Sequence, residues 1–241
     1  MTVPPLPYSP FGKTRDKRPF LHTSSAYGLV PFITQREGEE EAPDNLVIRE
    51  HAPGRRRLHY TDEDPARDRD MRGVLVARCS FNPCDEGGRM TGEPQWKMIH
   101  PHRQIMTMQN MRCQVCAEPA RTRLGYIFLA GPKDHDPEAP TVLTNQPPVF
   151  LKHARAAAVL CPHLERNPMV FLARSAPLYG VQGTLYGPGA DGVHAVARPA
   201  DPVPYGHRSL STFLASQVIR RLGAFRVVDL RQLLRSLRTA C

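Results

Sequence analysis

The chain has 241 residues, of which 41% are hydrophobic, so it carries enough apolar side chains for one large domain or two small ones. Its net charge is +9, with 27 arginines against five lysines. It contains no run near the roughly 18 apolar residues of a membrane span and no apolar signal segment near its start, which excludes those two classes and predicts a cytoplasmic protein.

The first 45 residues have the composition of a disordered leader. Five prolines fall among the first 19 residues, and the segment closes on the acidic run REGEEEAPD. Such a composition lacks the apolar content needed to build a core. We therefore expect residues 1–45 to be a tail and residues 46–241 to form a single α+β domain.

Several elements are expected in the first part of this domain. In chain order they are strands in NLVIREH and RRLHY on either side of the turn Pro53-Gly54, a strand in GVLVARCSF (73–81), a helix in PHRQIMTMQNMR (101–112) and a strand in LGYIFLAG (124–131). The helix is favoured because proline suits a helix start, and Ile105, Met108 and Met111 have the spacing of one helix face.

The second part continues with elements of both kinds. They are a helix at about 149–160, two strands around a turn in 168–187, a loose stretch at 188–207, a capped helix in SLSTFLASQVIRRLG (209–223), a strand in AFRVVDL (224–230) and a last helix in LRQLLRSLR (230–238). The predicted fold class is therefore α+β, with short strands and helices around a treble-clef-like zinc element at about 111–164.

The tract MRCQVC (111–116) carries the pattern from which the zinc element is inferred. Cys113 and Cys116 have the CxxC spacing of a zinc knuckle, which directs two thiolates at one tetrahedral ion. His153, near the start of the helix expected at 149–160, is the third ligand candidate. Cys161 is the fourth, although it lies eight residues further, about 12 Å along a regular helix, so it requires that helix to end early.

Two other uses of the cysteines remain open. Cys79 and Cys84 could join Cys113 and Cys116 in a four-cysteine site, or they could be ordinary thiols. A redox CxxC is disfavoured, because that chemistry needs the pair at a helix start after a strand, and here the pair follows a helical pattern.

An enzyme is the alternative to a binding protein. Asp134-His135, Asn145 and His153 follow the CxxC in the order seen in HNH endonucleases, where a histidine activates water beside a metal ion. His135 is thus one catalytic candidate, although its charged loop KDHDPEAP equally fits a solvated histidine. His100, next to Pro101, is the second, as a general base or a metal ligand. A biosynthetic metalloenzyme belongs to the same alternative.

Two charged tracts complete the candidates. The acidic residues between Asp62 and Asp70 could bind metal, but interleaved arginines favour a self-neutralised loop. Residues 205–241 contain seven arginines and one acid, and the last helix sets Arg231, Arg235 and Arg238 outside a leucine stripe. These three arginines could contact nucleic acid or an acidic protein, or form an ordinary solvated face.

Several tracts resemble a family of uncharacterised actinobacterial proteins of the streptomycete type. They are YTDEDPARDRDMRGVLVAR (60–78), IHPHRQIMTMQNMRCQVC (99–116), QPPVFLKHA (146–154), CPHL (161–164) and YGVQGTLY (179–186). Such relatives carry cysteines where this chain has Phe150 and His153. The resemblance implies a CxxC…(C/F)xx(C/H) element formed by a knuckle and a helix, and it implies no activity.

Overall fold

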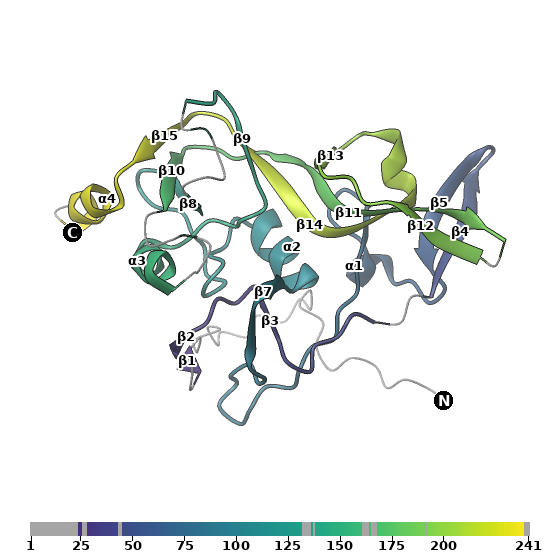
Figure 1. Ribbon diagram of the computed structural model, residues 1–241, viewed down its shortest axis with the longest axis horizontal. Coiled ribbons are helices and arrows are strands. Elements are labelled where there is room, and N and C mark those ends of the chain that lie inside the picture. Colours follow the sequence, from purple (N-terminus) through teal and green to yellow (C-terminus); the bar gives the residue numbers. More distant parts are fainter. Residues whose placement is uncertain are drawn as a thin grey trace.

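The computed structural model describes residues 24–25, 28–42, 45–131, 136, 138–160, 164, 168–190 and 192–238. These residues form both helices and strands, which confirms the α+β class, and most of the elements are strands. Two sheets, one of six strands and one of three, make up the body, and three two-stranded ribbons flank them (Figure 1).

The six-stranded sheet is built on two long antiparallel strands, β11 (Leu178–Gly189) and β14 (Phe213–Leu222). Shorter strands extend it: β12 (Gly192–Ala197) and β13 (Val203–Pro204) pair with β11, while β6 (Leu75–Val76) and β9 (Val142–Thr144) pair with β14. The strand predicted at 73–81 is therefore reduced to two residues, and the stretch expected to be loose carries two strands.

The helix predicted at 209–223 is wrong. Its first residues form a short 3-10 helix, η2 (Arg208–Thr212), and the rest is strand β14. The cap and the closing Gly223 suggested a helix, but Val218 and Ile219 are successive residues on opposite faces of the strand and both are buried. A central strand covered on both faces loses the period-two pattern, so here sheet pairing overrides the local signal.

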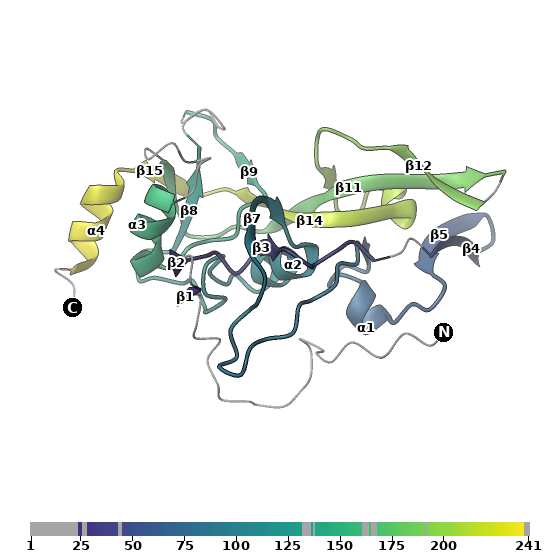
Figure 2. The ribbon, with the colours of Figure 1, turned by 60° about the horizontal axis from the view of Figure 1, so that its bottom comes forward.

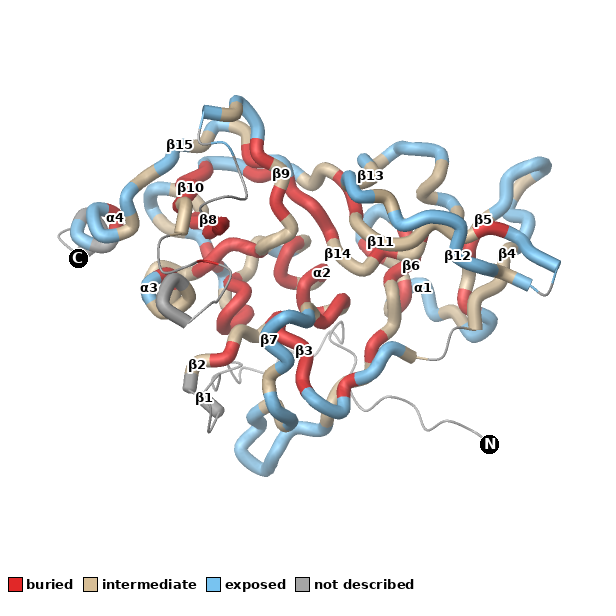
Figure 3. The backbone as a smooth tube through the Cα atoms, viewed as in Figure 1, coloured by how far each residue is buried: buried red, intermediate tan, exposed pale blue. Residues whose placement is uncertain are grey.

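The helix predicted at 101–112 is α2 (Pro101–Gln109), and it packs on this sheet. The Gln104 amide donates to the Val218 carbonyl at 2.9 Å and accepts from the Val218 N–H at 3.0 Å. At the other end of α2, buried Arg220 donates to the carbonyls of Met108, Gln109 and Ala176. The bonds to Met108 and Gln109 cap the C-terminal end of α2, and the bond to Ala176 links that end to the segment after β10. The helix and sheet are thereby locked together in the most buried part of the molecule (Figure 3).

The three-stranded sheet has the order β15 (Phe225–Val228), β10 (Met169–Ala173), β8 (Tyr126–Ala130). Helices α3 (Leu151–Leu160) and α4 (Leu230–Arg238) pack against it, through a core that includes Val149, Ala154 and Leu233. Both helices and all three strands agree with the sequence predictions. Strands β10 and β11, predicted as neighbours around a turn, instead join different sheets.

The ribbons comprise β1 (Ser24–Ser25) with β2 (Gly28–Leu29), β3 (Thr34–Arg36) with β7 (Pro94–Ile99), and β4 (Leu46–Ala52) with β5 (Arg55–Tyr60), which leads into α1 (Pro65–Asp68). The β4–β5 ribbon and α4 lie at opposite ends of the molecule (Figure 2).

Part of the predicted leader packs on the body. Strand β3 is buried, and Glu39 accepts hydrogen bonds from the buried guanidinium of Arg103 on α2. The N–H groups of Phe32 and Ile33 donate to the carbonyls of Val115 and Gln114 at 3.1 and 3.3 Å. Residues 28–42 are therefore part of the folded structure, whereas residues 1–23 lie outside the described residues.

Candidate metal centre

Cys113, Cys116 and His153 come together at one point of the fold. Their sulfur and ring nitrogen atoms all lie within 4.8 Å of one another, and the Cys113 Sγ is 3.5 Å from the Nδ1 of His153. Forty residues separate Cys113 from His153 in the chain. The grouping of these three candidates is therefore a result of the tertiary structure, and it agrees with the ligand set inferred from the CxxC.

The knuckle itself is a tight turn held by its backbone. The Cys113 N–H donates to the Glu118 carbonyl at 2.7 Å, and the Ala117 N–H donates to the Cys113 carbonyl at 2.8 Å. The Val115 N–H points at the Cys113 Sγ, 3.4 Å away. Ala117 takes a left-handed backbone conformation with φ of 58°, which alanine rarely adopts. The sharp turn after Cys116 therefore places the backbone of Ala117 in a strained conformation.

The start of helix α3 supplies the other half of the site. The Phe150 N–H, just before the helix, donates to the Cys113 Sγ at 3.1 Å. Neighbouring bonds fix this approach, since the Gln114 N–H donates to the Pro148 carbonyl at 2.9 Å and the Val149 N–H donates to the Ile127 carbonyl at 2.8 Å. Backbone N–H groups at a helix start stabilise negative charge, which favours a thiolate at this position.

The pKa values of the two cysteine thiols are shifted in opposite directions. Cys113 is fully buried, and Leu29, Tyr126 and Phe150 pack around the cysteines. The pKa of Cys113 is lowered to about 6, chiefly by the hydrogen bond from Cys116 and also by backbone N–H groups. The same hydrogen bond and burial raise the pKa of Cys116 to about 12. Cys113 is therefore the sulfur that more readily becomes the thiolate that a metal ion binds.

The donor set suits zinc, which binds thiolate sulfur and imidazole nitrogen in structural sites. Phe150 occupies one position where the resemblance implies a cysteine, and its ring centre lies 6.4 Å from that of His153. Cys161, the fourth ligand candidate, lies outside the described residues. Within the described parts of the chain, Cys79 and Cys84 are not members of this group. Burial raises the pKa of the Cys79 thiol to about 11, as in a core cysteine, and Cys84 is exposed.

The treble-clef prediction is supported only at its two ends. A treble clef places a hairpin between its knuckle and its helix. Here the two strands that lie between them, β8 and β9, pair with β10 and β14 respectively and belong to different sheets. The knuckle and the start of α3 do meet, as the Cys113–Phe150 contact shows.

The two catalytic candidates have different outcomes. His100 is fully buried, its Nε2 lies 3.0 Å from the Ser80 carbonyl, and its ring packs on Phe81. Burial, with the nearby charge of Arg103, lowers the pKa of His100 to about 3. A neutral imidazole enclosed in this way has no access to a substrate, which argues against a role as general base. His135 lies outside the described residues.

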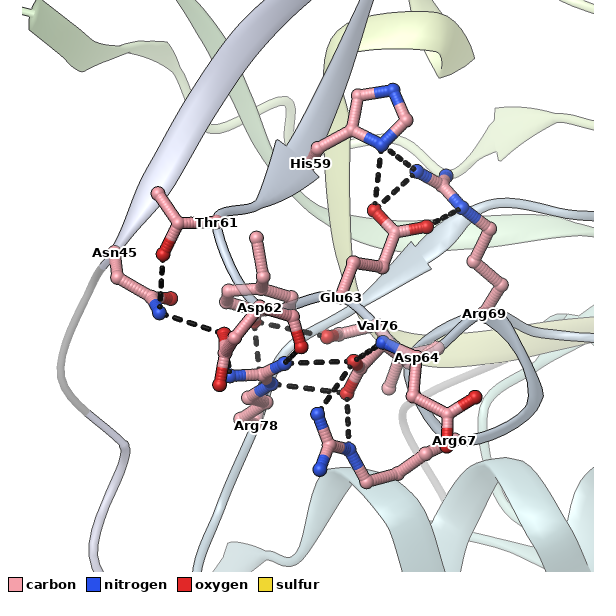
Figure 4. Close-up of polar contacts among 12 residues, drawn as sticks. Asn45, His59, Thr61, Asp62, Glu63, Asp64, Arg67, Arg69, Val76 and Arg78 are labelled. Carbon is pink, nitrogen blue, oxygen red and sulfur yellow. Dashed lines mark hydrogen bonds and ion pairs between the residues drawn. The ribbon is translucent and has the colours of Figure 1, made fainter. Parts of the chain in front are cut away.

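The acidic stretch at 62–70 is neutralised by arginines, as their interleaving suggested (Figure 4). Its centre is buried rather than solvated. The Asp68 carboxylate is fully buried and accepts hydrogen bonds from Arg67 and Arg78, with Arg78 also reaching Asp62. The Arg78 guanidinium stacks 3.9 Å from the Tyr60 ring centre. This network joins α1 to the β5 strand and to the residues after β6, which is a structural role.

Of the three arginines predicted to form a basic face on the last helix, two have described side chains. Arg231 and Arg235 are exposed on α4, while Leu233 of the same helix is buried. The side chain of Arg238 lies outside the described part of the chain. Arg220, counted in the basic segment 205–241, is buried against α2 and contributes nothing to a basic surface.

The sequence analysis missed a cleft of about 610 Å³ at one end of the three-stranded sheet. Its lining includes Arg121, Arg123, Arg174 and Arg226, which come from three separate segments. The sequence shows only scattered arginines in or near three predicted strands, and their spacing does not predict a cleft unless the strand ends are known to meet.

Comparison with known proteins finds no family model, no curated protein and no solved structure that matches this chain. The resemblance to actinobacterial proteins therefore stays a prediction. No helix among the described residues combines the length and the apolar character needed to cross a membrane.

Proposed function

We propose that the chain is a zinc-stabilised binding protein, in which Cys113, Cys116 and His153 hold a structural Zn²⁺ ion. The observation that carries this proposal is the convergence of the three ligand atoms within 4.8 Å at a buried junction. Structural zinc sites are closed and contribute folding free energy, while catalytic sites keep a position open to substrate. The enclosure of Cys113 by apolar residues favours the structural use.

The ion would reinforce a junction between three parts of the chain that hydrogen bonds already link. They are the knuckle, the start of α3 and residues 32–33, whose N–H groups bond to the knuckle carbonyls. In this proposal the knuckle and α3 form a treble-clef-like element. The strands between them, β8 and β9, belong to the two sheets instead of forming a hairpin. The proposed site has three protein ligands, because α3 runs to Leu160 and so does not end early, as a fourth ligand at Cys161 would require.

For the partner, we propose a polyanion, with nucleic acid first and an acidic protein second. The net charge of +9 and the exposed Arg231 and Arg235 of α4 support a basic contact surface. Each arginine that contacts a phosphate releases counterions, which makes the affinity for DNA fall with salt.

A salt titration of duplex DNA binding tests this function. We expect the logarithm of the binding constant to fall linearly with that of the salt concentration, at about −0.9 per phosphate contact. Replacing Arg231, Arg235 and Arg238 with glutamine should reduce this slope by up to about 3 and leave the zinc content unchanged. Fluorescence anisotropy with a labelled duplex measures both quantities.

Two outcomes would oppose the proposal. Absence of salt-dependent binding by the wild type would make the arginine face of α4 ordinary solvated surface. Nicking of plasmid DNA with added Mg²⁺, abolished by His135→Ala, would instead support the metal-dependent nuclease.

A further inference from the structure

The arginine-lined cleft has a defined place in the fold. Ala173, the last residue of β10, pairs with Tyr126, the first of β8, and with Phe225, the first of β15. The cleft opens at this end of the sheet, beside residues 121–125, Arg174 and residues 224–226. It is therefore formed by segments about 50 residues apart in the chain, each fixed at a strand end.

Local structure holds the arginines in place. Before β8, the Thr122 N–H donates to the Gly125 carbonyl at 2.9 Å, and the Thr122 hydroxyl donates to the same carbonyl at 2.7 Å. This turn sets Arg121 and Arg123 on the cleft. Gly125 has φ of 122°, and a Cβ at this position would collide with the Ala173 carbonyl, so glycine is required for the loop to approach β10. The Arg174 N–H donates to the Ala224 carbonyl at 3.2 Å, which ties the other two segments together.

The described lining of the cleft carries positive charges. Four guanidinium groups line it, and no carboxylate is found among the described residues of the lining. Like charges that share a cleft repel one another, and a bound anion relieves this repulsion. Elsewhere in the molecule, at Asp68 and Glu39, arginines are paired with carboxylates. Such carboxylates do not occur among the described residues that line the cleft.

The chemistry of the lining selects the kind of anion. Guanidinium groups bind phosphate through two parallel hydrogen bonds, and several arginines can share the oxygens of one phosphate. The cleft volume is far larger than a single phosphate needs and lies within the range of small-molecule sites. Leu124, Leu172 and Phe225 add apolar lining that could contact a sugar or a base.

From these observations we infer that the cleft binds the phosphate of a nucleotide unit, either within a nucleic acid or as a free nucleotide. This inference deepens the proposed function, on which it rests, by assigning a phosphate site that is separate from α4. Arg121, Arg174 and Arg226 contact the phosphate, and the apolar lining faces the rest of the nucleotide.

The test uses the full chain and a labelled 16-base-pair duplex. We expect Arg121→Gln/Arg174→Gln/Arg226→Gln to lower the salt slope by up to about 3 and to reduce affinity at 0.1 M salt by on the order of 100-fold. The matched control replaces Arg49, Arg55 and Arg56 with glutamine; these are exposed arginines on the β4–β5 ribbon at the opposite end of the molecule. The control makes the same change in net charge and should change affinity by less than about threefold, because those residues lie far from the cleft.

A single variant and a second probe complete the design. Arg226→Gln alone, at an exposed position, should lower the slope by up to about 1 if the triple variant folds poorly. Thermal shift with ATP, without DNA, reports on a free nucleotide. A rise in midpoint for the wild type that is absent in the cleft variant identifies the free nucleotide as the ligand and supports the inference.

Two results would overturn it. If the cleft variant binds DNA and ATP as the wild type does, while the α4 variant loses part of its salt slope, the cleft inference fails and the proposed function stands. If the wild type binds neither probe, both fail together.

Discussion

Cys113→Ser should destabilise the protein by more than about 3 kcal/mol, a loss of about 10 °C in thermal midpoint for a chain of this length. The reason is that metal binding free energy becomes folding free energy wherever the unfolded chain has no preformed site. Cys113 is also the acceptor for the N–H groups of Val115 and Phe150, so its loss weakens the contact between knuckle and helix. Thermal unfolding followed by circular dichroism measures the change.

Cys84→Ser is the matched control, because Cys84 is an exposed thiol outside the metal cluster. A surface substitution of this kind should alter stability by no more than about 0.5 kcal/mol. Removal of zinc from the wild type with a chelator should reproduce the Cys113→Ser midpoint. A Cys113→Ser midpoint equal to that of the wild type would contradict a structural role for the ion.

Asp68→Asn should cost about 3–5 kcal/mol at neutral pH, since it removes one partner from a buried ion-pair network. Asp68 is fully buried, and its carboxylate accepts from Arg67, Arg78 and the Asp64 N–H. Asparagine keeps the shape but leaves Arg67 without its ion-pair partner and Arg78 with only the exposed Asp62. Asp62→Asn is the control, because Asp62 shares Arg78 but is 64% exposed and should cost about 1 kcal/mol or less. Urea unfolding at pH 7 gives both values, and equal costs for the two variants would contradict the account.

The effect of Asp68 should also depend on pH in a defined direction. Burial alone would raise the pKa of Asp68, but the hydrogen bonds from Arg67 and Arg78 outweigh it and hold the pKa well below its usual range. A carboxyl with a depressed folded-state pKa stabilises the fold above its unfolded pKa, about 3.9, and loses that contribution as pH falls towards the folded value. The difference between wild type and Asp68→Asn should therefore be largest at neutral pH and should shrink below about pH 4. A stability difference that grows on acidification would contradict a depressed pKa for Asp68 in the folded state.

The sequence predicted local elements better than their pairing. Helix α2 and the final helix α4 carry apolar residues at helical spacing, so their local pattern and their packing agree. At β14 the two disagree. Val218 and Ile219 are buried on opposite faces because the strand is central, and such a doubly covered strand gives no alternation to recognise. Pairing with β11 in the sheet, which a local sequence pattern does not reveal, makes this segment a strand.

In the candidate site, too, features set by local spacing were predicted, whereas features that depend on tertiary contacts were not. The CxxC spacing fixed the knuckle, and His153 followed from the expected helix start, because both depend on local geometry. The burial of His100 depends on Ser80 and Phe81, which reach it only through the fold. The arginine cleft depends on three strand ends that meet in space, so it could not be predicted from spacing along the chain.

Zinc content of the purified protein, measured by mass spectrometry of the metal, is the most direct test of the central claim. We expect one equivalent of zinc per chain in the wild type and in Cys84→Ser, and none in Cys113→Ser, because the latter lacks one of the three clustered ligands. A wild type without zinc, or a Cys113→Ser variant that retains a full equivalent, would contradict it.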